Sequence, residues 1–208
     1  MHVFYLIKLL LKCTFFRVKF LAKNFHFPTY QNHFKEGFII ENDLLKPKNE
    51  FVFYSLFKKG NEDMTKDFIE SILEREIKKI EIISDENLLK KVAQGNFETS
   101  GLEVILDDDT ICNVKIEMFD HHDIGRRSLF YWSRLYKNHI MEHSQGKKIT
   151  KAITILILHY EVKRFEDENY ITKWKIIEDE NRETVLTDDF ELYIIELPKA
   201  MSTIRQNN

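Results

Sequence analysis

Two glutamates on neighbouring predicted strands are the residues of this chain best placed to do chemistry. Glu103 stands in GLEVIL and Glu117 in ICNVKIEMF, and the acidic run Asp107–Asp109 lies between them. Alternating apolar residues on both sides of a turn-forming run predict a β-hairpin. Carboxylates in such an apolar setting are costly to bury unless a cation compensates them. Two carboxylates that converge would offer the oxygen ligands that Mg²⁺ prefers, with room left for water and phosphate.

Convergence depends on the register of the hairpin, because opposite residues of an antiparallel pair share a face. A three-residue turn over Asp108–Thr110 places Glu103 opposite Lys115. Glu117 then lies one same-face step further along, roughly 7 Å from Glu103. A two-residue turn would put the two carboxylates on opposite faces. The alternative is that both glutamates lie on the solvated face of an edge hairpin, and the spacing alone favours that alternative.

The composition is that of a globular protein with one substantial core. The chain has 208 residues, of which 43% are hydrophobic and 31% charged, enough for a single domain. Its net charge is −3; residues 1–48 carry +5, and the remainder therefore carries −8. This balance argues against a purely electrostatic, metal-free DNA binder, although a local groove or a bound cation can invert the field. Cys13 and Cys112 form no motif, so neither a disulfide framework nor a zinc cluster is expected.

The amino-terminal stretch, MHVFYLIKLLLKCTFFRVKFLAKNF, is apolar but repeatedly interrupted by Lys and Arg. These charges exclude a membrane span of about 20 apolar residues and break the apolar stretch that a signal peptide needs. A basic amphipathic helix on a membrane surface is one interpretation, and a non-native extension is the one we favour. We expect residues 1–44 to form this extension, residues 45–200 the domain and residues 201–208 a tail, in a cytoplasmic protein.

Helical periodicity appears in two segments, residues 61–77 and 126–143. The second has a predicted apolar face made of Leu129, Trp132, Leu135, Tyr136, His139 and Ile140. Besides the hairpin, strands are expected within 77–84, 151–162, 170–177 and 188–199, the last one ending at Pro198. The run KAITILILHYEV is almost continuously apolar, as in a strand buried on both faces. The order of elements predicts an α/β domain whose central mixed sheet is flanked by helices.

At these residues the sequence resembles the PD-(D/E)XK nuclease family of transposases, also described as recombination-promoting nucleases. The resemblance runs from about Lys46 to Ala200 and rests on the order and spacing of PKNEFVFYSLF, GLEVI, KIEMF, RRSLFYWSRLY and VLTDDFELYIIELPK. It implies a restriction-endonuclease-like core, Mg²⁺ or Mn²⁺ as the cofactor, and DNA of mobile elements as the substrate. In the family an Asp and a Glu hold the cation, which would activate water for in-line attack on a phosphodiester. A Gln stands where related nucleases have the catalytic Lys.

Carried over position by position, the resemblance assigns the family's Asp to Glu103, its Glu to Glu117 and its Gln to Phe119. The acidic position of the opening motif falls on Glu50. Lys115 lies on the same strand face as Glu117 and is a candidate substitute for the missing polar group. The alternative for Lys115, a solvent-facing lysine at a strand edge, is the one we favour. The helix motif is matched by Arg127, Tyr131, Trp132 and Tyr136.

Two departures from the family pattern predict an impaired site. Glu103 in place of Asp extends the carboxylate by one methylene, roughly 1.5 Å, which disturbs a cation that demands near-ideal geometry. Phe119 in place of Gln removes a group that would orient water and brings an apolar ring next to the cation. We therefore expect a degenerate nuclease in a truncated mobile-element protein. The alternatives are an inactive relative that binds DNA or a protein through the same fold, and a chain that retains no selected function.

The second predicted helix also holds candidate DNA contacts. Arg126 and Arg127 could bind DNA phosphates or pair with acids of the preceding loop, and the sequence leaves both open. Tyr131, Trp132 and Tyr136 could stack on unpaired bases. For Trp132 and Tyr136 the helical spacing favours packing in the core. No membrane span is expected, and the oligomeric state is not determined by these patterns.

Overall fold

The computed structural model describes residues 53–54, 56–57, 59–83, 101–142, 151–165 and 169–206, without the side chains of 140–142 and 204–206. The expected extension, residues 1–44, and the motif residue Glu50 lie outside the described residues. Within the described part, no helix combines the length and apolarity that a membrane crossing requires.

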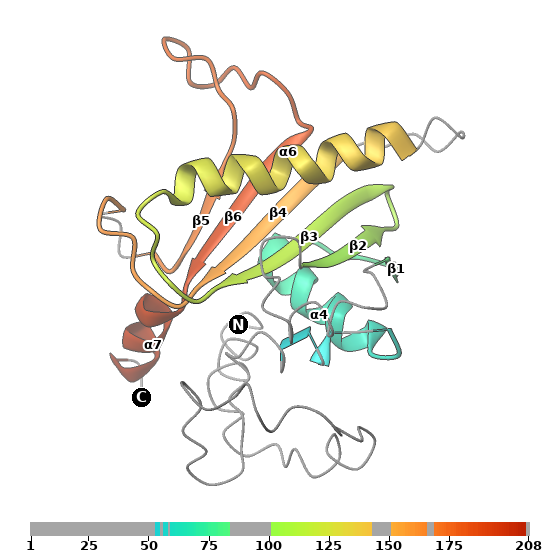
Figure 1. Ribbon diagram of the computed structural model, residues 1–208, viewed down its shortest axis with the longest axis horizontal. Coiled ribbons are helices and arrows are strands. Elements are labelled where there is room, and N and C mark those ends of the chain that lie inside the picture. The colour runs from blue at the N-terminus through green and yellow to red at the C-terminus, as the bar shows by residue number, and fades with distance from the viewer. Residues whose placement is uncertain are drawn as a thin grey trace, which may run out of the picture.

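A six-stranded mixed sheet forms the centre of the protein, in the order β1-β2-β3-β4-β6-β5 (Figure 1). β3, β4 and β6 run parallel, whereas β1, β2 and β5 pair antiparallel to their neighbours. This sheet confirms the predicted α/β architecture. The strands are β1 (Ile80–Ile82), β2 (Leu102–Leu106), β3 (Thr110–Glu117), β4 (Lys151–Leu158), β5 (Ile171–Trp174) and β6 (Phe190–Glu196).

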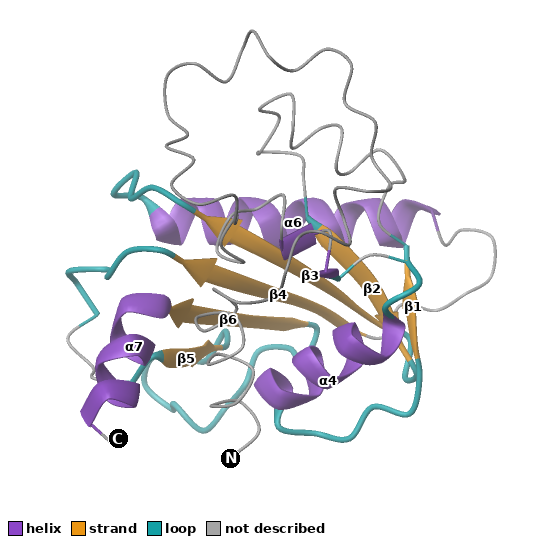
Figure 2. Ribbon diagram, turned by 90° about the horizontal axis from the view of Figure 1, so that it is seen from below, coloured by secondary structure: helices purple, strands orange, loops and turns teal. Residues whose placement is uncertain are grey.

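Three described helices flank this sheet: α4 (Glu62–Leu73), α6 (Ile124–Glu142) and α7 (Leu197–Gln206). α6 lies on one face, and α4 and α7 lie on the other (Figure 2). The two long helices were predicted, but α7 was not. We expected a strand up to Pro198 and then a tail, whereas β6 ends at Glu196 and the helix starts one residue later. Proline is compatible with this position because the first helical turn needs no N–H donor from it.

The buried face of α6 also differs in part from the predicted one. Leu135 and His139 are buried, as expected, but Leu129 is 55% exposed. Ile124 and Tyr131 take its place against the sheet. The face of α6 that packs against the sheet therefore contains polar side chains, which a search for apolar periodicity does not find.

The two faces of the sheet have different chemistry because alternate residues of each strand point to opposite sides. On the side of α4, β2 and β3 contribute apolar residues and Cys112 to the core, beside the buried Thr110 at the start of β3. These residues are Leu102, Val104, Leu106, Cys112, Val114 and Ile116. On the side of α6, the same two strands carry Glu103, Asn113, Lys115 and Glu117. The chemistry-bearing residues therefore lie between the hairpin and α6.

Glu191 is a buried carboxylate on the α4 side of β6, held by two lysines. Its Oε1 lies 2.9 Å from Lys151 Nζ and 3.0 Å from Lys173 Nζ, and its Oε2 accepts a hydrogen bond of 3.3 Å from the Tyr193 hydroxyl. Burial alone would raise the pKa of Glu191, but the two lysines outweigh it and bring this pKa below the usual 4.5. A pKa lowered in the folded state stabilises the fold fully above the unfolded pKa. This stabilisation is lost as the pH falls through the folded value.

We therefore expect Glu191→Gln to lower the free energy of unfolding by about 1–3 kcal/mol near neutral pH. The difference from the wild type should shrink as the pH falls below 4.5, where the native carboxylate takes up its proton. Urea denaturation across this pH range measures it, with Glu81→Gln on the exposed side of β1 as the control. A difference that is independent of pH would show that the ionised carboxylate is not the stabilising group.

Candidate active site

The β2–β3 hairpin sets the positions of the two predicted acidic ligands. Glu103 pairs with Asn113, so the expected pairing with Lys115 was wrong by two residues. The turn consists of Asp107–Asp109, because Asp109 adopts a left-handed φ of 59° and Thr110 already belongs to β3. A three-residue hairpin loop commonly ends with such a left-handed residue. The shift by two preserves the side of the sheet, and both glutamates still face α6.

The shift nevertheless separates the two carboxylates. Glu117 lies four residues beyond Asn113, about 13 Å further along the strand at about 3.3 Å per residue. Glu103 Oε1 accepts a hydrogen bond of 3.3 Å from the Asn113 side-chain amide, and its Oε2 lies 3.8 Å from His139 Nε2. The two glutamates therefore have different partners, at different positions along the hairpin.

Glu117 is 5% exposed and is enclosed by two side chains of α6. Arg127 Nη2 donates to both carboxylate oxygens, at 2.9 and 2.7 Å. The Tyr131 hydroxyl donates to Oε1 at 2.6 Å and accepts from Arg127 Nη2 at 2.7 Å. Arg127 and Tyr131 are four residues apart and so lie one above the other on the helix. The three side chains form a closed ring of hydrogen bonds, here called the Glu117 ring.

Electrostatics agree with this arrangement. Burial alone would lower the pKa of Arg127, but its hydrogen bond and charge interaction with Glu117 outweigh burial and raise that pKa. Burial, followed by the nearby Glu117 carboxylate, raises the pKa of Tyr160 well above its usual 10.0. Arg127 is therefore a permanent cation at the position where the resemblance implies a metal ion.

Lys115 is a buried neighbour of the Glu117 ring. It is 4% exposed, and its Nζ lies 3.8 Å from the centroid of the Tyr131 ring, within the range of a cation–π contact. β3 is also an inner strand, between β2 and β4. The interpretation that we favoured for Lys115, a solvent-facing lysine at a strand edge, was therefore wrong. The interpretation that Glu117 lies on the solvated face of an edge hairpin was also wrong.

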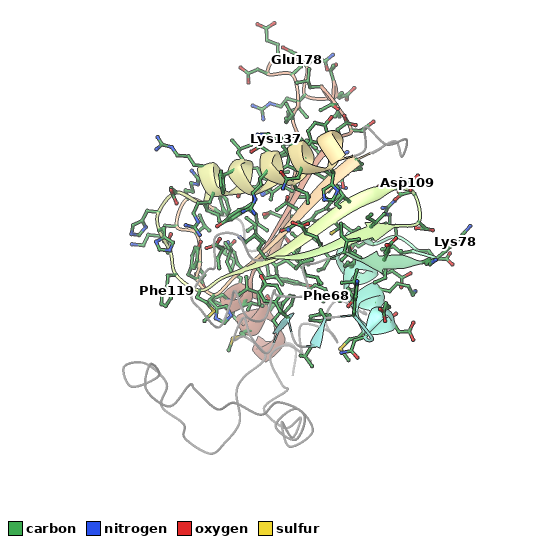
Figure 3. All side chains as sticks on the ribbon, turned by 45° about the vertical axis from the view of Figure 1, so that its right-hand side comes forward. Phe68, Lys78, Asp109, Phe119, Lys137 and Glu178 are labelled. Atoms are coloured by element: carbon green, nitrogen blue, oxygen red, sulfur yellow. The ribbon has the colours of Figure 1, made fainter. Side chains whose placement is uncertain are left out.

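Phe119 follows the end of β3 and is 71% exposed. It lies at the rim of the protein, away from the middle of the sheet (Figure 3). Its ring is therefore largely exposed to solvent, and its placement next to a bound cation stays a prediction. The cation that binds the Glu117 carboxylate is the guanidinium of Arg127, which donates hydrogen bonds to both of its oxygens.

These residues do not fit a divalent cation in this arrangement. Mg²⁺ requires several oxygen ligands in near-octahedral geometry. Arg127 and Tyr131 engage the Glu117 carboxylate, and Glu103 lies too far along the hairpin to share an ion with it. Among the residues that the structure describes, no three His, Cys, Asp or Glu side chains gather in a way that could hold a metal ion.

The other residues of the helix motif have structural partners. The Trp132 and Tyr136 rings stack at 4.7 Å with an angle of 17° between their planes. Trp132 Nε1 donates to the Ala152 carbonyl at 2.9 Å, and the Tyr136 hydroxyl donates to Asp189 Oδ2 at 2.9 Å. Both rings are partly buried and pack against the core, as the helical spacing predicts.

The two arginines at the start of α6 have different surroundings. Arg126 is exposed, whereas the Arg127 side chain is 25% exposed and pairs with Glu117. Neither alternative considered for Arg127, a DNA phosphate or a loop acid, included this strand carboxylate. No regular spacing marks this contact in the sequence, because Arg127 and Tyr131 are four residues apart but the next such position is Leu135.

Comparison with known proteins gives one match. The family model described as PD-(D/E)XK nuclease family transposase matches residues 47–208. No curated protein and no solved structure matches the chain. The matched range includes every described helix and strand, the Glu117 ring and the hairpin.

Proposed function

Because this chain belongs to the PD-(D/E)XK nuclease family of transposases, we propose that it binds DNA without cleaving it at an appreciable rate. The restriction-endonuclease-like α/β fold supports DNA as the substrate. The observation that carries the second part is the Glu117 ring, in which Arg127 already neutralises the carboxylate. A metal ion at Glu117 would have to displace this guanidinium, and Glu103 lies too far away to assist.

A second candidate function is divalent-cation-dependent endonuclease activity, with Mg²⁺ or Mn²⁺ as the cation. It is favoured by the burial of Glu117 and Lys115 at successive same-face positions of β3, an acidic and a basic side chain at one place in the fold. The family description, transposase, supports mobile-element DNA as the target of either function. Recombination of that DNA in the cytoplasm is the process that we propose for it.

The test measures binding and cleavage on the same preparations. Fluorescence anisotropy with labelled oligonucleotides should show binding that weakens steeply as salt is raised, because phosphate contacts release counterions. Nicking of supercoiled plasmid with Mg²⁺ or Mn²⁺ should not exceed that of a matched Glu117→Ala preparation. Phe119→Gln restores the polar residue of the family pattern and shows whether that position limits cleavage.

The outcomes separate the two candidates. Nicking by the wild type that disappears in Glu117→Ala supports the endonuclease. A nicking activity that appears only in Phe119→Gln identifies a disabled enzyme. Salt-sensitive binding without nicking by any variant supports the binding function, and absence of DNA binding contradicts our proposal.

A further inference from the structure

The outer surface of α6 carries an interleaved row of basic and aromatic side chains, here called the α6 stripe. It consists of Arg126, Phe130, Ser133 and Lys137, spaced four, three and four residues apart, so that they align along one side of the helix. All four are exposed, and Phe130 is 54% exposed. Lys137 lies on the side of the helix away from the sheet (Figure 3). The stripe starts one residue before Arg127, at the end of α6 that holds the Glu117 ring.

Charge favours nucleic acid over other occupants of this surface. The helix α6, Ile124–Glu142, contains four Lys or Arg and a single acid, Glu142 at its last residue, in a chain whose net charge is −3. Of these cations, Arg127 faces Glu117 and the two in the stripe face outward. An exposed surface that combines positive charge with an aromatic ring is suited to a polyanion with flat, stackable faces.

A second exposed apolar surface gives the contrast. The excursion between β5 and β6, residues 175–189, exposes Leu186 at 74% and Ile177 at 44%. It contains six Asp or Glu and two Lys or Arg, so its charge repels phosphate. Both surfaces therefore expose apolar side chains. Of the two, the α6 stripe combines them with the positive charge that DNA binding requires.

We propose that the α6 stripe binds unpaired DNA, with Phe130 stacked on a base and Arg126 and Lys137 contacting phosphates on either side of it. The two cations are eleven residues apart, about 16 Å along the helix, so the contact spans several nucleotides. An intact duplex hides the faces of its bases, whereas a single strand offers them to the ring. This inference rests on the proposed function, DNA binding, and specifies the form of DNA that is bound.

The test compares a labelled single strand with a duplex of the same length by fluorescence anisotropy, using the full chain. The wild type should bind the single strand more tightly. Phe130→Ser should weaken single-strand binding about tenfold and change duplex binding by less than about twofold, because only the single strand exposes stackable bases. The double variant Arg126→Gln with Lys137→Gln should weaken binding to both DNAs and reduce the salt dependence. Leu186→Ser, an exposed apolar residue on the acidic excursion, is the matched control and should change neither.

Phe130 is exposed, so Phe130→Ser should retain the fold, and circular dichroism verifies this. Equal single-strand affinity in Phe130→Ser and the wild type, with DNA binding otherwise intact, overturns the inference and leaves the proposed function standing. Sedimentation gives a further outcome that overturns it. If the wild type is a dimer and Phe130→Ser is a monomer of unchanged DNA affinity, the stripe joins two copies of the chain. If the wild type binds neither DNA, the proposed function fails, and this inference fails with it.

Discussion

Arg127→Met should lower the free energy of unfolding by about 3 kcal/mol, because it leaves a buried carboxylate without its cation. Glu117 is 5% exposed, and Arg127 Nη2 lies within hydrogen-bond distance of both its oxygens. Methionine fills much of the space of the arginine stem but cannot donate a hydrogen bond. Urea denaturation at neutral pH, followed by circular dichroism, measures the loss.

Two further variants isolate the ion pair. Arg126→Met removes the neighbouring exposed arginine and should change stability by less than about 0.5 kcal/mol. The double variant Glu117→Gln with Arg127→Met removes both charges and should recover part of the loss, since no carboxylate is then left uncompensated. Equal effects of Arg126→Met and Arg127→Met would contradict the Glu117 ring as a stabilising element.

On the opposite face of the sheet, Phe68→Ala should lower the free energy of unfolding by about 3–5 kcal/mol. Phe68 is 1% exposed, and its ring centroid lies 4.8 Å from that of Phe57 and 5.8 Å from that of Phe53. Truncation removes buried apolar surface and leaves a cavity in a cluster of rings. The same denaturation experiment measures it.

Met64 provides the control for Phe68, since it lies on the same helix and is 36% exposed. Met64→Ala should cost less than about 0.5 kcal/mol. Similar losses for both variants would mean that α4 does not pack its phenylalanine face against the sheet. A large loss for Phe68→Ala alone confirms that α4 is held by its buried phenylalanine cluster.

The main elements of the fold could be predicted from the sequence, because each has a periodicity of its own. α4 and α6 follow helical spacing, and β4 is an apolar run buried along nearly its whole length. The register of β2 and β3 could not be predicted, because the acidic run can be divided into turn and strand in more than one way. The left-handed backbone of Asp109 decides between them, and no residue type in that run requires it in advance.

The candidate site was predictable only in part, for a related reason. The types of residue at Glu117 and Lys115 identified the strand face that carries chemistry. Their partners come from α6, and a contact between a strand and a helix leaves no spacing in the sequence by which to find it. Burial of Lys115 also depends on β4, which pairs with the edge of β3 opposite to β2. Only the order of strands in the sheet reveals this pairing.

Both hydrogen-bond donors to the Glu117 carboxylate belong to a single helix, α6. Arg127 and Tyr131 are one turn apart on α6, so a tilt of that helix away from β3 would withdraw both donors from the carboxylate at once. The reverse of the same helix carries Arg126, Phe130 and Lys137. A force on the outer side of α6 that tilts the helix therefore also changes the hydrogen bonds that the Glu117 carboxylate receives on the inner side. No other segment has to transmit this change.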